Sequence, residues 1–134
     1  KVEVSNREYP NHYEVRSLLG TDIRVMTLSD MFAHKLCALG ERITPRDIYD
    51  VWFFLQNRTE INAEIVQLRT GLSVSEYAQQ CATQVRSYSS RMLMQGLGEV
   101  LLDNQSKNFA RQQLIPATAS ALELFALCPL IAEL

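Results

Sequence analysis

The sequence predicts an α+β domain in which short N-terminal strands are followed by a mainly helical C-terminal bundle. Residues 1–5 alternate between charged or polar and apolar side chains, which is the period of a half-buried strand. Residues 23–28 are rich in β-branched side chains and predict another strand, and residues 13–18 are a further candidate. From residue 29 onward, apolar residues recur at helical spacing, so we expect about six helices there.

The first two predicted helices begin at capping residues. Ser29 is a good N-cap for a helix that would end near Gly40. Thr44 caps a second helix that runs to about residue 57, with Pro45 in its first position and Asp47 three residues after the cap. This second helix is apolar nearly all round its circumference, which predicts a central place in the fold.

The remainder of the chain predicts further helices. Ser73 and Glu76 form the pattern of a capping box, which opens a helix that runs to about residue 87. Gly71 would end the helix before it, and Pro116 would separate two helices near the C-terminus. The other expected segments are helices at residues 60–70, 90–102, 109–114 and 117–127 and a loop at residues 103–107.

Composition and charge exclude several classes of protein. The net charge of −2 over 134 residues argues against a broadly basic nucleic-acid-binding surface, although a local basic pocket is still possible. No apolar run reaches the roughly 18 residues needed to span a membrane. The three cysteines are widely spaced and predict neither a disulfide framework nor a zinc site. We expect buried thiols in a reducing cytoplasm at Cys37, Cys81 and Cys128.

Two cations in the first predicted helix are candidates for anion binding. Lys35 and Arg42 are seven residues apart, so they lie on nearly the same ridge if the helix continues past Gly40. Two cations on one ridge suit a polyanion such as a triphosphate. The alternative is structural: a lysine whose stem lies along packed surface, and an arginine at the negative end of a helix dipole.

Carboxylates supply a second set of candidates. Asp47 and Asp50 are three residues apart on one helix face next to apolar residues, where each needs a partner such as Arg42 or Arg46. Alternatively, these acids favour the helix dipole, and Asp47 contributes to capping. Glu3 could ligate a metal from its predicted strand, or it could lie on a solvated strand face.

The order of these residues resembles the AbiEii/AbiGii toxin family of nucleotidyltransferase-like proteins, in the polymerase β superfamily. The resemblance covers residues 1–57 and is most specific in HKLCALGERITPRDIYDVWFFL. It implies that residues 1–57 are the C-terminal part of a nucleotidyltransferase-like core, whose strands are the remnant of its sheet. Residues 58–134 would be a helical bundle packed with this core as one unit. The matching pieces, in order, are Lys1-x-Glu3, Val-Met-Thr-Leu-Ser, Lys35-Leu-x-Ala-Leu, Arg42 and Arg46-Asp47-x-x-Asp50.

The resemblance also implies a function. Family members are toxins of toxin–antitoxin or abortive-infection systems and transfer a nucleotide from an NTP with Mg²⁺, in some members to tRNA. We therefore expect a cytoplasmic protein without membrane contact. Its expected partners are an NTP, a cognate antitoxin and, as a possible acceptor, tRNA. The apolar C-terminus could also support oligomerisation. The implied roles are phosphate binding and catalysis for Lys35, catalysis for Asp47, phosphate binding for Arg42 and Arg46, support of the motif for Asp50, and metal binding for Glu3.

Two motifs of the family do not occur in these 134 residues: a Gly-Ser pair and an Asp-x-Asp metal-binding pair. The resemblance places both upstream of Lys1. We therefore expect this fragment to be inactive by itself and to hold neither Mg²⁺ nor an NTP tightly. The alternative function, from another class, is a non-catalytic helical module for protein interaction.

Overall fold

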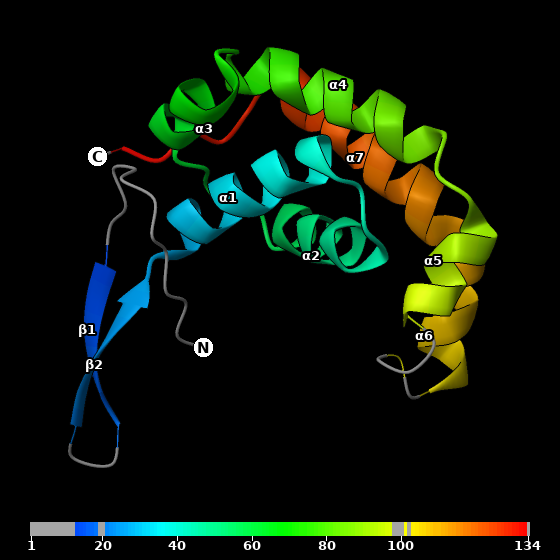
Figure 1. Ribbon diagram of the computed structural model, residues 1–134, viewed down its shortest axis with the longest axis horizontal. Coiled ribbons are helices and arrows are strands. Elements are labelled where there is room, and N and C mark those ends of the chain that lie inside the picture. Colours follow the sequence, from blue (N-terminus) through cyan, green and yellow to red (C-terminus); the bar gives the residue numbers. More distant parts are fainter. Residues whose placement is uncertain (1–12, 19–20, 98–100, 102, 134) are drawn as a thin grey trace.

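The computed structural model describes residues 13–18, 21–97, 101 and 103–133. Most of this part of the chain is helical (Figure 1). The helical elements are α1 (Leu28–Glu41), α2 (Pro45–Gln56), α3 (Ala63–Thr70), α4 (Val74–Arg86), α5 (Ser90–Leu97), α6 (Asn104–Phe109), the π-helical segment η1 (Ala110–Leu114) and α7 (Ile115–Leu127).

The predicted α+β fold is wrong, because the described residues form a mainly helical assembly without a sheet that helices cover. Their ladder-forming strands are limited to an antiparallel hairpin of β1 (Tyr13–Leu18) and β2 (Thr21–Met26), in which Tyr13 pairs with Met26. This hairpin extends away from the helices (Figure 1). A two-stranded hairpin buries little apolar surface, so helix packing dominates the fold. The strand predicted at residues 1–5 lies outside the described residues.

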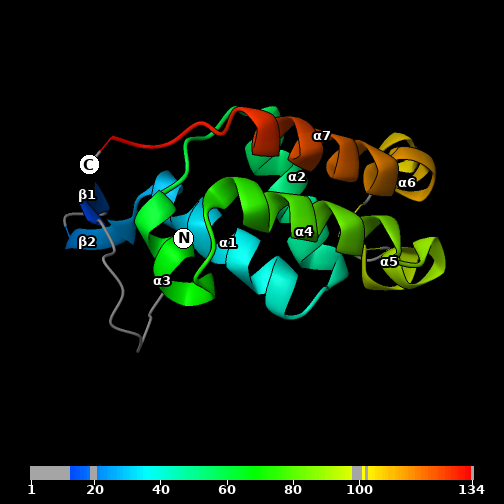
Figure 2. The same ribbon diagram turned by 90° about the horizontal axis from the view of Figure 1, so that it is seen from above.

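The helices pack in two antiparallel pairs. Helices α4 and α7 lie side by side along the molecule, and α1 and α2 form a second pair against them (Figures 1 and 2). Helix α1 contacts α3 and α4, while α2 contacts α5 and α7. The first two helices are therefore fixed by elements from the C-terminal half of the chain.

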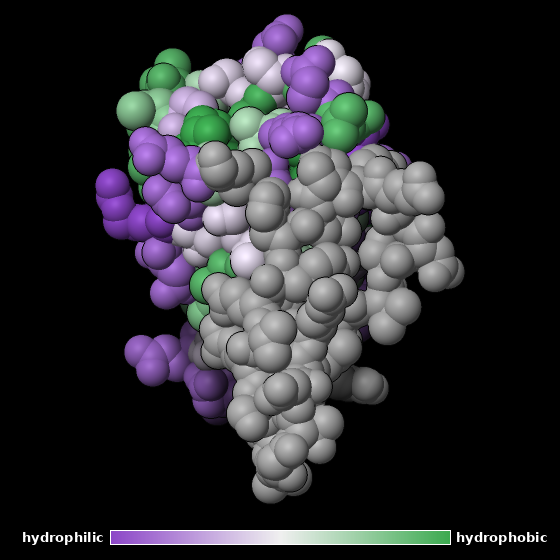
Figure 3. Space-filling view, turned by 90° about the vertical axis from the view of Figure 1, so that its left-hand side faces the viewer, coloured by the Kyte–Doolittle hydropathy of each residue, from purple (hydrophilic) through white to green (hydrophobic). Residues whose placement is uncertain are grey.

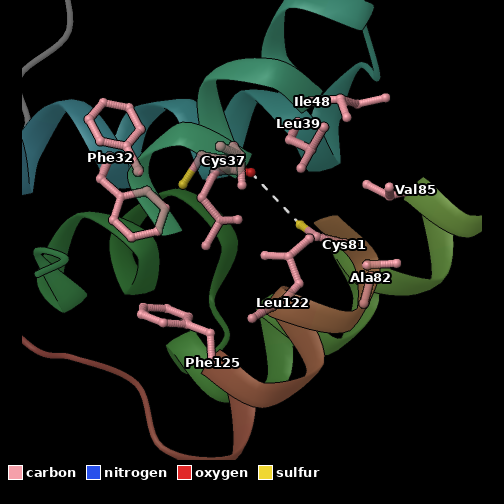
Figure 4. Close-up of a cluster of buried hydrophobic side chains, with 14 of the residues drawn as sticks. Phe32, Cys37, Leu39, Ile48, Cys81, Ala82, Val85, Leu122 and Phe125 are labelled. Carbon is pink, nitrogen blue, oxygen red and sulfur yellow. Dashed lines mark hydrogen bonds between the residues drawn. The ribbon is translucent and has the colours of Figure 1, made fainter. Parts of the chain in front are cut away.

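One hydrophobic core joins these helices (Figure 4). From α1, Phe32, Leu36 and Leu39 are all completely buried, as expected for the apolar face of a helix. The ring of Phe32 stacks on Phe54 of α2 at 5.2 Å between centroids and lies 5.5 Å from the ring of Phe125 of α7. Aromatic contacts thus connect three helices at the centre of the core.

Some large apolar side chains lie outside this core. In α2, Phe53 is 55% exposed, so one side of this helix faces solvent although the helix contacts α1, α5 and α7. On the face of the molecule that carries the hairpin, hydrophobic side chains form separate patches between hydrophilic ones (Figure 3). The exposed large apolar residues among those described are Leu28, Phe53, Leu68, Met92, Leu124, Leu127 and Ile131.

Several predicted helix ends are confirmed. Thr44 caps α2 and Pro45 is its first residue. Ser73 and Glu76 form the capping box of α4. Gly71 ends α3 in the left-handed conformation with φ of 74°, which glycine adopts without steric cost.

The ends of α1 differ from the prediction. The helix begins at Leu28 after Thr27, which makes no side-chain capping bond, so Ser29 lies within its first turn. It also continues through Gly40 to Glu41. Gly40 has a packing role instead, because a Cβ there would lie 1.9 Å from Oη of Tyr77 in α4.

The C-terminal region is more continuously helical than predicted. Residues 103–107 were expected to be a loop, but Asp103 caps α6 by accepting a hydrogen bond from the Ser106 amide at 2.7 Å. Pro116 does not separate two helices, since it lies in the first turn of α7, where a missing N–H is tolerated. The π-helical segment η1 joins α6 directly to α7.

The segment after α7 returns to the start of α3. Ile61 donates its amide hydrogen to the Leu130 carbonyl at 2.8 Å and accepts from the Ala132 amide at 2.9 Å. Beside this contact, the buried Asn62 donates to Oδ1 of the buried Asp30 at 2.9 Å. Among the described helices, none has both the length and the apolar character needed to cross a bilayer.

Candidate functional site

Lys35 lies near the middle of α1 and faces the first turns of α2. Its Nζ atom is 3.2 Å from Oδ2 of Asp50 and 3.9 Å from Oδ1 of Asp47. The lysine side chain is 25% exposed, so its ammonium group lies at the edge of the packed interface between the two helices. The crossing of α1 and α2 therefore brings one cation of the first helix to two acids of the second.

Asp47 is held by the local sequence of α2 as well as by Lys35. The Thr44 hydroxyl donates to Oδ2 of Asp47 at 2.8 Å, and the Asp47 amide donates to Oγ1 of Thr44 at 3.2 Å. These bonds satisfy a free N–H group of the first turn and fix the orientation of a nearly buried carboxylate. The capping role considered for Asp47 and its contact with Lys35 thus occur together.

Asp50 bridges two cations. One of its oxygens pairs with Lys35, and the other accepts from Nε of Arg46 at 3.2 Å, one helical turn earlier in α2. The Arg46 side chain is 57% exposed, so its two terminal nitrogens lie towards solvent. We call Lys35, Arg46, Asp47 and Asp50 the α1–α2 cluster; it contains two positive and two negative charges.

Arg42 does not belong to this cluster. It is the C-cap of α1, with a φ of −150° that turns the chain out of the helix, and its side chain is exposed. Its backbone amide donates to the Ala38 carbonyl, but its side chain makes no hydrogen bond or ion pair with another described residue. Glu3, the predicted metal ligand, lies outside the described residues.

Comparison with protein families identifies the chain. The family model of the nucleotidyl transferase AbiEii toxin, type IV TA system, matches residues 1–125. The chain belongs to this family. The predicted resemblance is thereby confirmed, and it extends beyond residues 1–57 into α7. No curated protein and no solved structure matches the chain.

Membership of the AbiEii family establishes a coarse function. The protein is a member of a family of toxins of type IV toxin–antitoxin systems, which implies an antitoxin as its counterpart. The α1–α2 cluster lies within the matched residues. What this AbiEii-family chain does to a substrate depends on the chemistry that the cluster can support.

The described residues of this AbiEii toxin do not fit a magnesium site. Among them, no group of three or more histidine, cysteine or acidic side chains lies close enough together to hold a metal ion. Asp47 and Asp50 come nearest to such a set, but their oxygens already contact Lys35, Arg46 and the Thr44 hydroxyl. These carboxylates therefore hold the cations of the α1–α2 cluster.

Two raised pKa values in the AbiEii toxin occur in the core behind α1. Burial, together with the neighbouring Cys37, raises the pKa of the Cys81 thiol to about 12. Burial also raises the pKa of Tyr77, whose hydroxyl donates to the Cys37 carbonyl at 2.8 Å. Both groups stay protonated at neutral pH, so neither supplies a nucleophile. The expectation of three buried thiols is wrong for Cys128, which is exposed just after α7.

Sequence reasoning missed two features of the site region. Thr44 was recognised as a cap, but the hydrogen bond from its hydroxyl to the Asp47 carboxylate was not expected. The Thr-Pro-x-Asp spacing could have indicated this bond. The place of His34 was not predicted either: it is partly buried, and its Nδ1 lies 3.0 Å from Nη1 of Arg69 in α3. Arg69 also donates twice to the carboxylate of Glu41, which ties the end of α1 to α3.

Proposed function

We propose that this AbiEii-family toxin acts as a nucleotidyltransferase that takes its nucleotide from an NTP and transfers it to tRNA, and that the α1–α2 cluster binds the phosphates. The observation that carries the proposal is the position of Lys35, a partly exposed ammonium held at a helix crossing by two carboxylates. The carboxylates that contact Lys35 both come from α2, so the packing of α1 on α2 determines where the lysine ammonium lies.

Each cation of the cluster has a distinct task in this proposal. Lys35 acts as a compact point charge towards a phosphate oxygen. Arg46 is held through Nε by Asp50, which leaves its terminal nitrogens to form paired hydrogen bonds with phosphate. Arg42, exposed four residues earlier in the chain, adds positive charge near the start of α2.

Phosphate binding requires that Lys35 exchange partners. An ion pair between partly exposed groups contributes only about 1 kcal/mol or less, so a multiply charged triphosphate can displace Asp50 from the lysine. Asp47 stays in place because the Thr44 hydroxyl and the helix N-terminus hold its carboxylate. In this arrangement Asp47 limits the movement of Lys35, while Asp50 stays paired with Arg46.

Catalysis needs groups that the described residues do not provide. The family resemblance implies Mg²⁺, with Glu3 among its ligands, but neither a Gly-Ser pair nor an Asp-x-Asp pair occurs in these 134 residues. We propose that a longer protein supplies these motifs and that the present chain provides the phosphate-binding side of the site. This chain should therefore not label RNA when incubated with purified tRNA and each radioactive NTP, and measurable labelling would contradict this part of the proposal.

The phosphate-binding role is tested by titrating the chain with each of the four NTPs and following amide chemical shifts by NMR. Lys35→Gln should weaken binding by roughly ten- to a hundredfold, because a hydrogen bond to a charged group contributes about 1.5–3 kcal/mol. Arg58→Gln is the matched control, since Arg58 is an exposed cation beyond the other end of α2. Equal affinities for the two variants would show that Lys35 does not bind the phosphates.

A second candidate function is favoured by the exposed apolar side chains. Leu124 and Leu127 of α7 are 69% and 82% exposed, and Phe53 of α2 is 55% exposed. Such residues suit a helical interaction module or an oligomer. Light scattering coupled to size-exclusion chromatography tests self-association, and a chain that self-associates but binds no NTP would favour this function over nucleotide transfer.

A further inference from the structure

A groove lies between α5 and η1. Helix α5 lies at the end of the molecule opposite the hairpin (Figure 1). The groove has a volume of about 410 Å³. Helix α5 contributes Ser90, Arg91, Met94 and Gln95 to its walls, and η1 contributes Arg111. We propose that this α5–η1 groove binds one nucleotide unit of a single-stranded RNA, the acceptor in the proposed transfer reaction.

The charges of the groove favour a phosphate group. Arg91 and Arg111 are both exposed, and neither forms an ion pair with another described residue. Arg111 donates to Oδ1 of Asn108 at 3.1 Å, a neutral partner that leaves its charge uncompensated. No acidic side chain is among the described residues that line the groove. Two guanidinium groups without an ion-pair partner among the described residues, at the wall of one groove, can contact the same phosphate through paired hydrogen bonds.

The apolar part of the groove suits a base. Met94 is partly buried and packs on the core, and it adds a polarisable apolar surface to the lining of the groove. Ser90 and Gln95 add hydroxyl and amide groups that can hydrogen-bond to the edge of a base or to a ribose hydroxyl. Base-edge hydrogen bonds and phosphate contacts are among the interactions by which proteins recognise single-stranded RNA, and Met94 would supply an apolar contact to the base in place of an aromatic ring.

The groove is rigidly connected to the α1–α2 cluster. A Cβ on Gly96 of α5 would lie 2.5 Å from Cγ of Pro45, so the last turn of α5 packs directly on the first turn of α2. Arg91 is five residues before Gly96, which is about 8 Å along the helix axis. An RNA bound in the groove would therefore be held at a fixed separation from Arg46 and Asp47, as an acceptor requires.

Fluorescence anisotropy with a fluorescein-labelled single-stranded RNA that ends in CCA tests the inference on the present chain. The double variant Arg91→Gln, Arg111→Gln should bind about tenfold more weakly or worse, and the slope of log affinity against log salt should fall by about 0.7, the value for one lost phosphate contact. Met94→Ala should weaken binding severalfold without changing that slope. Arg58→Gln, which removes the same charge at the other end of α2, should change the affinity less than about twofold.

Three outcomes would overturn the inference: no binding of the RNA by the unaltered chain, equal losses in the double variant and in Arg58→Gln, or an unchanged salt slope in the double variant. Circular dichroism melting shows that each variant is folded before its affinity is used. The inference rests on the proposed function only for the identity of the RNA as acceptor. Lys35→Gln separates the two, because it should weaken NTP binding and leave RNA binding intact. Unchanged NTP binding in this variant would contradict the proposed function, and weakened RNA binding would contradict the inference about the groove.

Discussion

At the scale of single residues, the two aspartates of α2 differ in how firmly they are held. Asp47 is nearly buried and exchanges two hydrogen bonds with Thr44, so its carboxylate is part of the helix N-terminus. Asp50 is more exposed and contacts only the side chains of Lys35 and Arg46 in the described structure. The first aspartate therefore contributes to folding, whereas the second mainly positions cations.

This difference predicts unequal costs for two matched substitutions. Asp47→Ala should lower the free energy of unfolding by about 1–2 kcal/mol, because it removes the first-turn bonds and leaves the Thr44 hydroxyl without its acceptor. Asp50→Ala should cost less than about 1 kcal/mol, since its ion pairs are partly exposed. Urea unfolding followed by circular dichroism measures both, and a larger loss for Asp50→Ala would contradict this assignment.

Gly40 gives a prediction whose sign depends on one neighbour. Replacing glycine by alanine inside a helix normally stabilises it by about 0.5–1 kcal/mol. Here the added Cβ would meet Oη of Tyr77 at 1.9 Å, so Gly40→Ala should destabilise the protein by about 1–3 kcal/mol. In a Tyr77→Ala background the same change should become stabilising. Thermal unfolding of the unaltered chain, the two single variants and the double variant gives a double-mutant cycle. If Gly40→Ala destabilises the protein equally with and without Tyr77, the contact with Tyr77 is not the cause of the destabilisation.

At the scale of elements, the pairing of α4 with α7 predicts a contrast within one helix. Leu122 is completely buried against α4, while Leu124 is 69% exposed on the other side of α7. Leu122→Ala should therefore cost about 2–5 kcal/mol through the cavity that it leaves. Leu124→Ala should change stability by less than about 0.5 kcal/mol. Denaturant midpoints of the two variants check this, and similar losses would mean that α7 packs with a different face.

Elements were predictable from sequence where local chemistry determines them. Thr44, Ser73 and Gly71 act within one turn of their own helices, and the structure has all three at the predicted ends. Gly40 and Pro116 were misjudged because their effects depend on distant residues. Gly40 lies inside α1 to admit a tyrosine from α4, and Pro116 follows a π-helical segment that keeps the chain helical. The prediction of a sheet was wrong because period-2 patterns near the N-terminus indicate strands but do not show how many strands pair with one another.

The candidate site could be predicted only in part for a similar reason. Spacing placed Asp47 and Asp50 on one helix face, but the contact of both with Lys35 depends on how α1 crosses α2. Arg42 was expected beside Lys35 on one ridge, and the backbone turns away at that residue. The α5–η1 groove was not predicted, because Arg91 and Arg111 are brought together by a contact between elements that are distant in sequence.

At the scale of the whole molecule, the buried thiol of Cys81 and the buried hydroxyl of Tyr77 predict a loss of stability at alkaline pH. Burial raises the pKa of the Cys81 thiol to about 12 in the folded protein, well above that of a free thiol, and burial also raises the pKa of Tyr77. The folded state therefore keeps these protons to higher pH than the unfolded state. Their stabilising contribution is fully present below about pH 9 and is lost as the pH rises towards 12.

Urea midpoints measured from about pH 7 to pH 11 should thus stay level to about pH 9 and then fall. Cys81→Ala removes one of the two titrating groups, so the fall should be shallower in this variant even if its stability at neutral pH is lower. A decline of the same steepness in both proteins would show that Cys81 does not contribute. The exposed Cys128 provides a matched control, because Cys128→Ala should leave the pH profile unchanged.

The contact between Gly96 and Pro45 has a consequence for how such sequences diverge. Because a Cβ at position 96 would lie 2.5 Å and 2.7 Å from two atoms of the proline ring, the two positions cannot accept substitutions independently. Relatives that carry a larger residue at position 96 should also differ at position 45, and those that keep the proline should keep the glycine. The same reasoning couples positions 40 and 77. Within each of these two pairs, the positions should therefore change together among relatives, although they are far apart in the chain. Each pair corresponds to one contact between two helices.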